Sequence, residues 1–94
     1  MADRYRLGGK LPYTLYRQLG AQSTLDDPIL GFWSNPDHAA EAVRVLNGGT
    51  GSTLPWLFAW HDGSIGTGSA TLALAVSPGI AAGIVRDLND RRIT

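Results

Sequence analysis

Two histidines beside carboxylates are the side chains in this sequence best suited to catalysis or metal binding. His38 follows Asp37, and His61 precedes Asp62. An imidazole next to a carboxylate can act as a general base or help to hold a zinc ion. A zinc site, however, repeats its ligands at characteristic spacings, and no pair of the HxxxH kind occurs here. We therefore interpret both histidines as polar surface residues and expect no metal site.

Glycine-rich segments offer a second kind of chemistry, the binding of phosphate by backbone amides. Residues 47–53 (NGGTGST) have the glycines of a phosphate loop but lack its lysine, and they would follow a helix instead of preceding one. Residues 63–68 (GSIGTG) do not have the dinucleotide-binding spacing. Asp26-Asp27 is typical of a turn, and no serine lies in a nucleophile elbow. We predict no cofactor, no catalytic residues and no enzymatic activity.

A third set of residues is suited to binding. Its aromatic, aliphatic and arginine side chains are of the types found at protein interfaces. The members are Arg4, Arg6, Tyr16, Ile29, Trp33 and Leu57. Whether these side chains form one surface depends on the strands that carry them.

The composition bounds the class of protein. Eight basic and eight acidic side chains cancel, so no overall field draws the chain to nucleic acid or to a membrane. No cysteine is present, which suits a reducing compartment. The first residues, MADRYR, lack the apolar segment of a secretory signal. These properties predict one cytoplasmic domain that spans all 94 residues.

One segment occurs twice in the chain. Residues 29–47 (ILGFWSNPDHAAEAVRVLN) and 71–89 (TLALAVSPGIAAGIVRDLN) share eight identical residues in nineteen aligned positions. A repeat at a fixed offset is the sign of a duplicated structural unit. We predict a first unit over residues 1–48, a linker over 49–53 and a second unit over 54–94.

Each copy reads as a short strand followed by a helix. Asn35 and Ser77 are good N-caps, and a proline follows each of them at the first helical position. Between Asp62 and Arg86 no residue is charged, a length at which a membrane span must be considered. The proline at position 78 and the repeat instead assign this stretch to strand, cap and helix. We therefore expect no membrane span.

The other apolar segments complete a set of five strands. Residues 4–7 and 11–17 are predicted to form a hairpin with a three-residue loop, which pairs Leu7 with Leu11 and Tyr5 with Tyr13. The remaining strands cover residues 28–33, 54–60 and 70–76, with a turn-rich loop at 61–69. The predicted fold is α+β, a tandem ββα duplication with an extra N-terminal strand. One mainly antiparallel sheet would carry both helices on one face.

Alternation along the strands assigns each side chain to a face of the sheet. The predicted helix-facing set is Tyr13, Leu15, Leu30, Phe32, Trp56, Phe58, Trp60, Leu72, Leu74 and Val76. The predicted reverse set is Arg4, Arg6, Thr14, Tyr16, Ile29, Gly31, Trp33, Leu57, Ala59, Thr71, Ala73 and Ala75. The binding-type residues thus gather on the reverse face, which is more apolar than a water-exposed sheet face usually is.

Three interpretations of that reverse face are open. Loops of the chain itself, at residues 18–27 or 61–69, could cover it. A protein partner or a second copy could bind there, because tyrosine, tryptophan and arginine are enriched at interfaces. Nucleic acid could also bind, with bases stacked on the aromatic rings and arginines on the phosphates. The absence of net charge argues against nucleic acid, and the interface residues favour a protein partner.

Part of the chain resembles small accessory proteins of actinobacteria and their phages. The resemblance covers about half of the sequence and is carried by Tyr13-x-x-Tyr16-Arg17-Gln18, Asp26-Asp27-Pro28-Ile29-Leu30-Gly31 and Asn35-Pro36-x-x-Ala39-Ala40-x-x-Val43, with Asn47. It implies a small cytoplasmic protein without catalytic residues that acts by binding a host or phage protein. We predict a self-associating protein-interaction module, with a nucleic-acid-binding module as the alternative.

Overall fold

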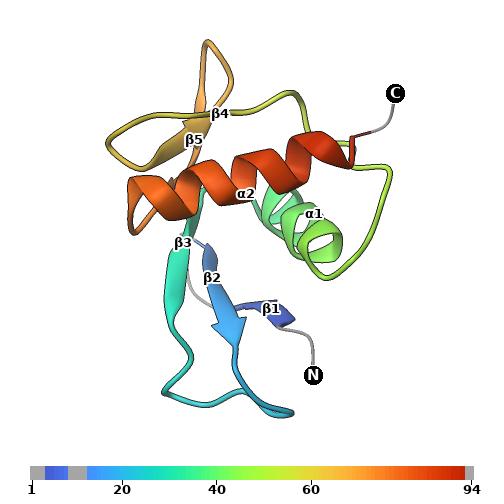
Figure 1. The fold of residues 1–94 in the computed structure, drawn as a ribbon, viewed down its shortest axis with the longest axis vertical. Coiled ribbons are helices and arrows are strands. Elements are labelled where there is room, and N and C mark those ends of the chain that lie inside the picture. The colour runs from blue at the N-terminus through green and yellow to red at the C-terminus, as the bar shows by residue number, and fades with distance from the viewer. Residues whose placement is uncertain (1–3, 9–12, 93–94) are drawn as a thin grey trace.

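The computed structural model describes residues 4–8 and 13–92 of the chain. Its elements are β1 (Arg4–Leu7), β2 (Tyr13–Gln18), β3 (Ile29–Trp33), α1 (Pro36–Leu46), β4 (Phe58–Ala59), β5 (Ser64–Gly66), β6 (Thr71–Ala75) and α2 (Pro78–Asp90). The six strands form one antiparallel sheet in the order β1-β2-β3-β6-β5-β4. In Figure 1, α2 crosses in front of the sheet with α1 beside it. The predicted α+β class is confirmed.

Both helices begin where their caps predict. The side-chain oxygen of Asn35 accepts hydrogen bonds from the backbone N–H groups of Asp37 at 2.8 Å and His38 at 3.1 Å. The Ser77 hydroxyl accepts one from the Ile80 N–H at 3.2 Å. These bonds satisfy donors that have no partner within the first helical turn.

The predicted loop at residues 61–69 contains a strand, β5, that the sequence pattern did not reveal. Its sequence, Ser-Ile-Gly, has a single apolar side chain, and Ile65 is buried in the core. The neighbouring strand β4 is correspondingly shorter than the predicted range 54–60. The sheet therefore has six strands instead of five.

The hairpin of β1 and β2 has a different register from the predicted one. Leu7 lies opposite Leu15, and Tyr5 lies opposite Arg17. The predicted pairing with Leu11 and Tyr13 is wrong by four residues. Residues 9 and 10 of the predicted loop, and residues 11 and 12 of the predicted second strand, lie outside the described part of the chain. Because four is an even number, the shift keeps every side chain of the two strands on its predicted face.

The two halves of the chain have the same order of elements, three antiparallel strands and then a helix. They meet where β3 pairs with β6, and Phe32 lies opposite Leu74, its counterpart at the repeat offset of 42 residues. Each half also has one irregularity in its strand pairing. In the pairing of β2 with β3, Leu30 has no opposite residue on β2, and in the pairing of β5 with β6, Leu72 has none on β5. These two positions are again 42 residues apart.

An asparagine at the end of each helix holds the first extended segment of the same half. The Asn47 side chain accepts from the Tyr5 N–H at 2.7 Å and donates to the Tyr5 carbonyl at 2.9 Å. Asn89 makes the same pair of bonds with Leu57, both at 2.9 Å. Each amide therefore replaces the partner that a neighbouring strand would provide to that residue.

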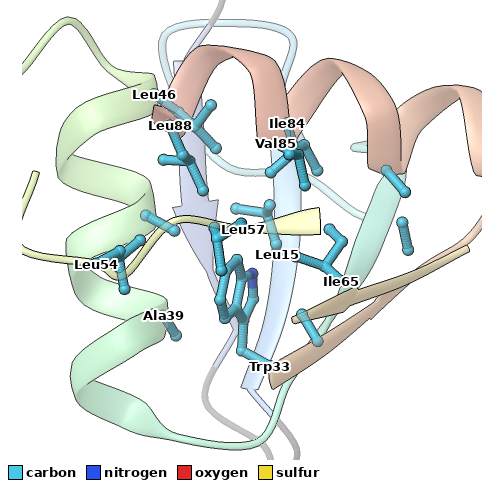
Figure 2. Close-up of a cluster of buried hydrophobic side chains, with 14 of the residues drawn as sticks. Leu15, Trp33, Ala39, Leu46, Leu54, Leu57, Ile65, Ile84, Val85 and Leu88 are labelled. Carbon is cyan, nitrogen blue, oxygen red and sulfur yellow. The ribbon is translucent and has the colours of Figure 1, made fainter. Parts of the chain in front are cut away.

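The core lies between one face of the sheet and the two helices (Figure 2). Leu15, Trp33 and Ile65 contribute its large side chains from the sheet, and each is at most 1% exposed. Alanines at inner positions of β6 and of both helices keep the layers close together. The indole of Trp33 points into the space between the helices, beside Leu57 (Figure 2).

Candidate functional site

The sheet face turned away from the helices, called the open face below, is the main candidate for a binding site. Strand register places Thr14, Phe32, Leu74 and Ser64 side by side across four strands of this face. The residues next to them along the strands point to the core. Leu74 is 49% exposed, so the described loops do not cover the face at β6, whereas Thr14, at the β2 end of the same row, is only 8% exposed.

Four of the six predicted binding residues lie on the open face. Arg6 pairs with Tyr16, which pairs in turn with Ile29, and Arg4 lies two residues further along β1 on the same side. Ile29 is 40% exposed and Arg4 is also exposed. Their location agrees with the sequence analysis, and their contact with a partner stays a prediction.

The predicted placement of Trp33 and Leu57 on this face is wrong. Each side chain is 1% exposed and belongs to the core (Figure 2). The inner residues of β3 and β6 next to Trp33 are glycine and alanine, which are too small to fill the space below the helices. A tryptophan at this position fills it. Neither residue is available to a partner.

The predicted faces are reversed for residues 31–33, 57–60 and 73–76, whereas Ile29, Leu30, Thr71 and Leu72, on the other side of the two strand irregularities, keep their predicted faces. Gly31, Ala59, Ala73 and Ala75 face the helices, whereas several residues expected in the core lie outside. Those placed on the open face by register or alternation are Phe32, Phe58, Trp60, Leu74 and Val76. Phe58 is 49% exposed and Val76 52%. The open face is therefore apolar, as predicted, but it is formed by different side chains.

A groove of about 280 Å³ opens on this face beside the central strands. Its lining is mostly apolar and comes from β3, β6 and the residue after β3, namely Phe32, Ser34, Thr71, Leu72, Ala73 and Leu74. The groove contains no ionisable side chain and so has no group for acid–base chemistry. Its shape and lining suit an apolar side chain of another molecule.

One edge of the open face carries a group of polar contacts. The Arg6 guanidinium lies 4.2 Å from the centre of the Tyr16 ring and forms a 3.0 Å ion pair with Asp27. Burial raises the pKa of the Asp27 carboxyl, but hydrogen bonds from the Leu19 and Thr24 N–H groups and from Arg6 outweigh it and keep the pKa below its usual value. This arrangement fixes the loop between β2 and β3.

The other candidates for chemistry do not form a site in the described part of the chain. No group of three histidine, aspartate or glutamate side chains there could hold a metal ion. The glycine-rich linker after α1 is held by a carboxylate of the same chain, because Glu41 accepts hydrogen bonds from the N–H of Thr53 at 2.7 Å and from its hydroxyl at 2.9 Å. A negative group at this place disfavours phosphate binding.

Sequence reasoning missed the exposed aromatic and aliphatic residues of the open face. The available signal was Gly31, where an added Cβ would lie 2.7 Å from the Leu74 carbonyl oxygen. A glycine within a strand often marks such a close backbone approach.

Comparisons with known proteins add no further assignment. No family model, curated protein or solved structure matches this chain. Within the described residues, neither helix has the length and apolar content to cross a membrane.

Proposed function

We propose that this chain is a non-catalytic protein-interaction module that associates with itself through the open face. The observation that carries the proposal is the group of exposed apolar side chains that extends from the middle of one sheet face to its β4 edge. Leu74 and Phe58, both 49% exposed, flank β5 on this side. Exposed apolar patches of this kind are typical of interaction surfaces.

A second copy is the partner that best fits the chemistry of this surface. The row from Thr14 through Phe32 and Leu74 to Ser64 contains no charge, so its occupant must be similarly uncharged at its centre. The six strands have two to six residues each, and at about 3.3 Å per residue and about 4.8 Å between strands they give roughly 400 Å² on each copy. Two such faces bury about 800 Å², which is typical of weak, transient interfaces, so the expected dimer is of low affinity.

We also infer that the two halves are copies of one βββα unit. Three features support this: the pairing of Phe32 with Leu74, the matching strand irregularities, and the equivalent bonds made by Asn47 and Asn89. If each residue of β3 is exchanged with the residue 42 positions later in β6, the register between the two strands stays the same. A local two-fold axis would then pass between Phe32 and Leu74, at the centre of the proposed interface.

Nucleic-acid binding is the alternative, and the local contacts favour it less. Arg6 is already paired with Asp27, and its guanidinium covers one side of the Tyr16 ring on which a base would stack. Trp33, the other proposed stacking residue, is buried. Arg4 is left as the exposed cation of this group.

Sedimentation equilibrium of wild type and of a Leu74→Lys variant tests the proposal. Lysine at the centre of the face would bury a charge between two copies, so the wild type should dimerise and the variant should stay monomeric. Leu25→Lys is the matched control, because Leu25 is fully exposed in the loop between β2 and β3. A wild type that stays monomeric at high concentration contradicts self-association. If the wild type is monomeric and binds a single-stranded oligonucleotide with an affinity that falls as salt is added, the nucleic-acid-binding alternative is supported.

A further inference from the structure

The two long edges of the open face differ in charge. At one edge, β1 presents Arg4 and Arg6. At the other, the rings of Phe58 and Trp60 lie 6.4 Å apart, and Asp62 is exposed in the turn that joins β4 to β5. The centre between these edges is uncharged. The face therefore has one edge whose exposed cation is Arg4, with Arg6 held by Asp27, and one edge that combines a carboxylate with aromatic rings.

The charged groups of the two edges lie at the same level along the strands. The Gly63 carbonyl accepts a hydrogen bond from Ala75, which pairs with Gly31 of β3. This row of paired residues continues through Leu15 of β2 to Leu7 of β1. The next row, one residue further along the strands, has Asp62 at one end and Arg6, which pairs with Tyr16, at the other. A line drawn along the strands between β3 and β6 thus has the two arginines on one side and Asp62 on the other.

From this arrangement we infer how two copies dock, which rests on the proposed self-association. The two-fold axis of the dimer runs parallel to the strands, between β3 and β6. The β1 edge of each copy then lies over the β4–β5 edge of the other. The arginines of each copy therefore approach Asp62 of the other copy, which gives two equivalent contacts. Sheets packed face to face lie about 10 Å apart, within reach of an arginine and a carboxylate extending from opposite sides.

The other two-fold orientation forms no such pairs. An axis across the strands through the centre between Phe32 and Leu74 places β1 over the β1 of the second copy, and the arginines of each copy then lie at the opposite end of the face from Asp62 of the other. Only the axis along the strands brings opposite charges together, and charge complementarity of this kind selects an orientation. In the proposed orientation the arginines also approach Phe58 and Trp60, whose ring faces attract a guanidinium.

Charge exchange between the edges tests the orientation. Arg4→Glu and Asp62→Lys should each weaken the dimer by about tenfold at low salt, because each puts like charges opposite one another at two symmetric contacts. The double variant Arg4→Glu/Asp62→Lys should recover most of the affinity lost in the single variants, since the exchanged charges are again opposite. Arg6 is left unchanged because it is bound to Asp27.

The dissociation constant is measured by sedimentation equilibrium at low and high salt, with far-UV circular dichroism to confirm folding. Arg86→Glu is the matched control, because that side chain is 75% exposed on α2, outside the open face. Recovery in the double variant, with no change in the control, supports the orientation. If the double variant loses as much affinity as the two single variants together, the orientation is wrong, although self-association itself is not contradicted. A monomeric wild type overturns both proposals.

Discussion

Replacing Trp33 by alanine separates a core position from an interface position. Trp33 is 1% exposed, and its cross-strand partners are Ala73, which is too small to fill the space left by an indole, and Tyr13, which is partly buried against the same core. Ala39 lies on the helix side of the ring (Figure 2) and is equally small. We therefore expect a loss near the upper end of the range of about 3–5 kcal/mol found for such truncations. A domain of this size has a total stability of about 5–14 kcal/mol.

Urea unfolding followed by circular dichroism measures this loss. With a denaturant slope of about 1–1.5 kcal/mol/M, the midpoint should fall by about 3–5 M, or the variant should be unfolded without urea. Leu74→Ala, next to Trp33 on the opposite strand but half-exposed, should cost only about 1 kcal/mol. Repeating each titration at a tenfold lower protein concentration separates folding from association. If Trp33→Ala keeps its stability and loses only its association, the residue lies at an interface and the core described above is wrong.

Two further predictions concern side chains that hold the backbone. Asn89→Ala should lower the unfolding free energy by about 1–3 kcal/mol and Asn47→Ala by less. Each substitution removes two hydrogen bonds, but those of Asn89 are more buried. Equal losses in urea titrations would contradict this ranking. Hydrogen bonds from Arg44 and Thr53 lower the pKa of Glu41 from 4.5 to about 2. The unfolded chain therefore takes up this proton first, so the stability contributed by Glu41 is present above pH 4.5 and is lost as the pH falls towards 2. Glu41→Gln should flatten the decrease in stability over this range, and an unchanged pH profile would show that Glu41 is not the group responsible.

The helices were the most predictable part of this fold because local chemistry determines where they begin. Asn35 and Ser77, each followed by proline, provide the bonds and the backbone angle that a first turn needs. Strand β5 was not predictable in this way, because Ser-Ile-Gly resembles a turn unless its neighbours are known. Only the pairing with β4 and β6 makes it a strand.

The faces of the central strands were not predictable from alternation. In β3 (ILGFW) and β6 (TLALA) apolar residues occupy both sets of alternate positions, so hydrophobicity does not select the buried set. The choice depends on volume, because the space beneath two alanine-rich helices suits Trp33 better than Phe32. In β1 and β2 the polar and apolar residues alternate, and there Arg4, Arg6 and Tyr16 were placed correctly.

The bonds made by Asn47 and Asn89 have a consequence for how large an assembly of this protein can become. In an open sheet, the outer strand on each side has free N–H and C=O groups to which further chains can add without limit, as in a fibril. At both margins of this sheet an amide occupies one such pair of groups, at Tyr5 and at Leu57. Growth by strand addition is thereby hindered in both directions. The self-association proposed above, through the open face alone, would end at two copies, so these two asparagines would favour a finite complex over an aggregate.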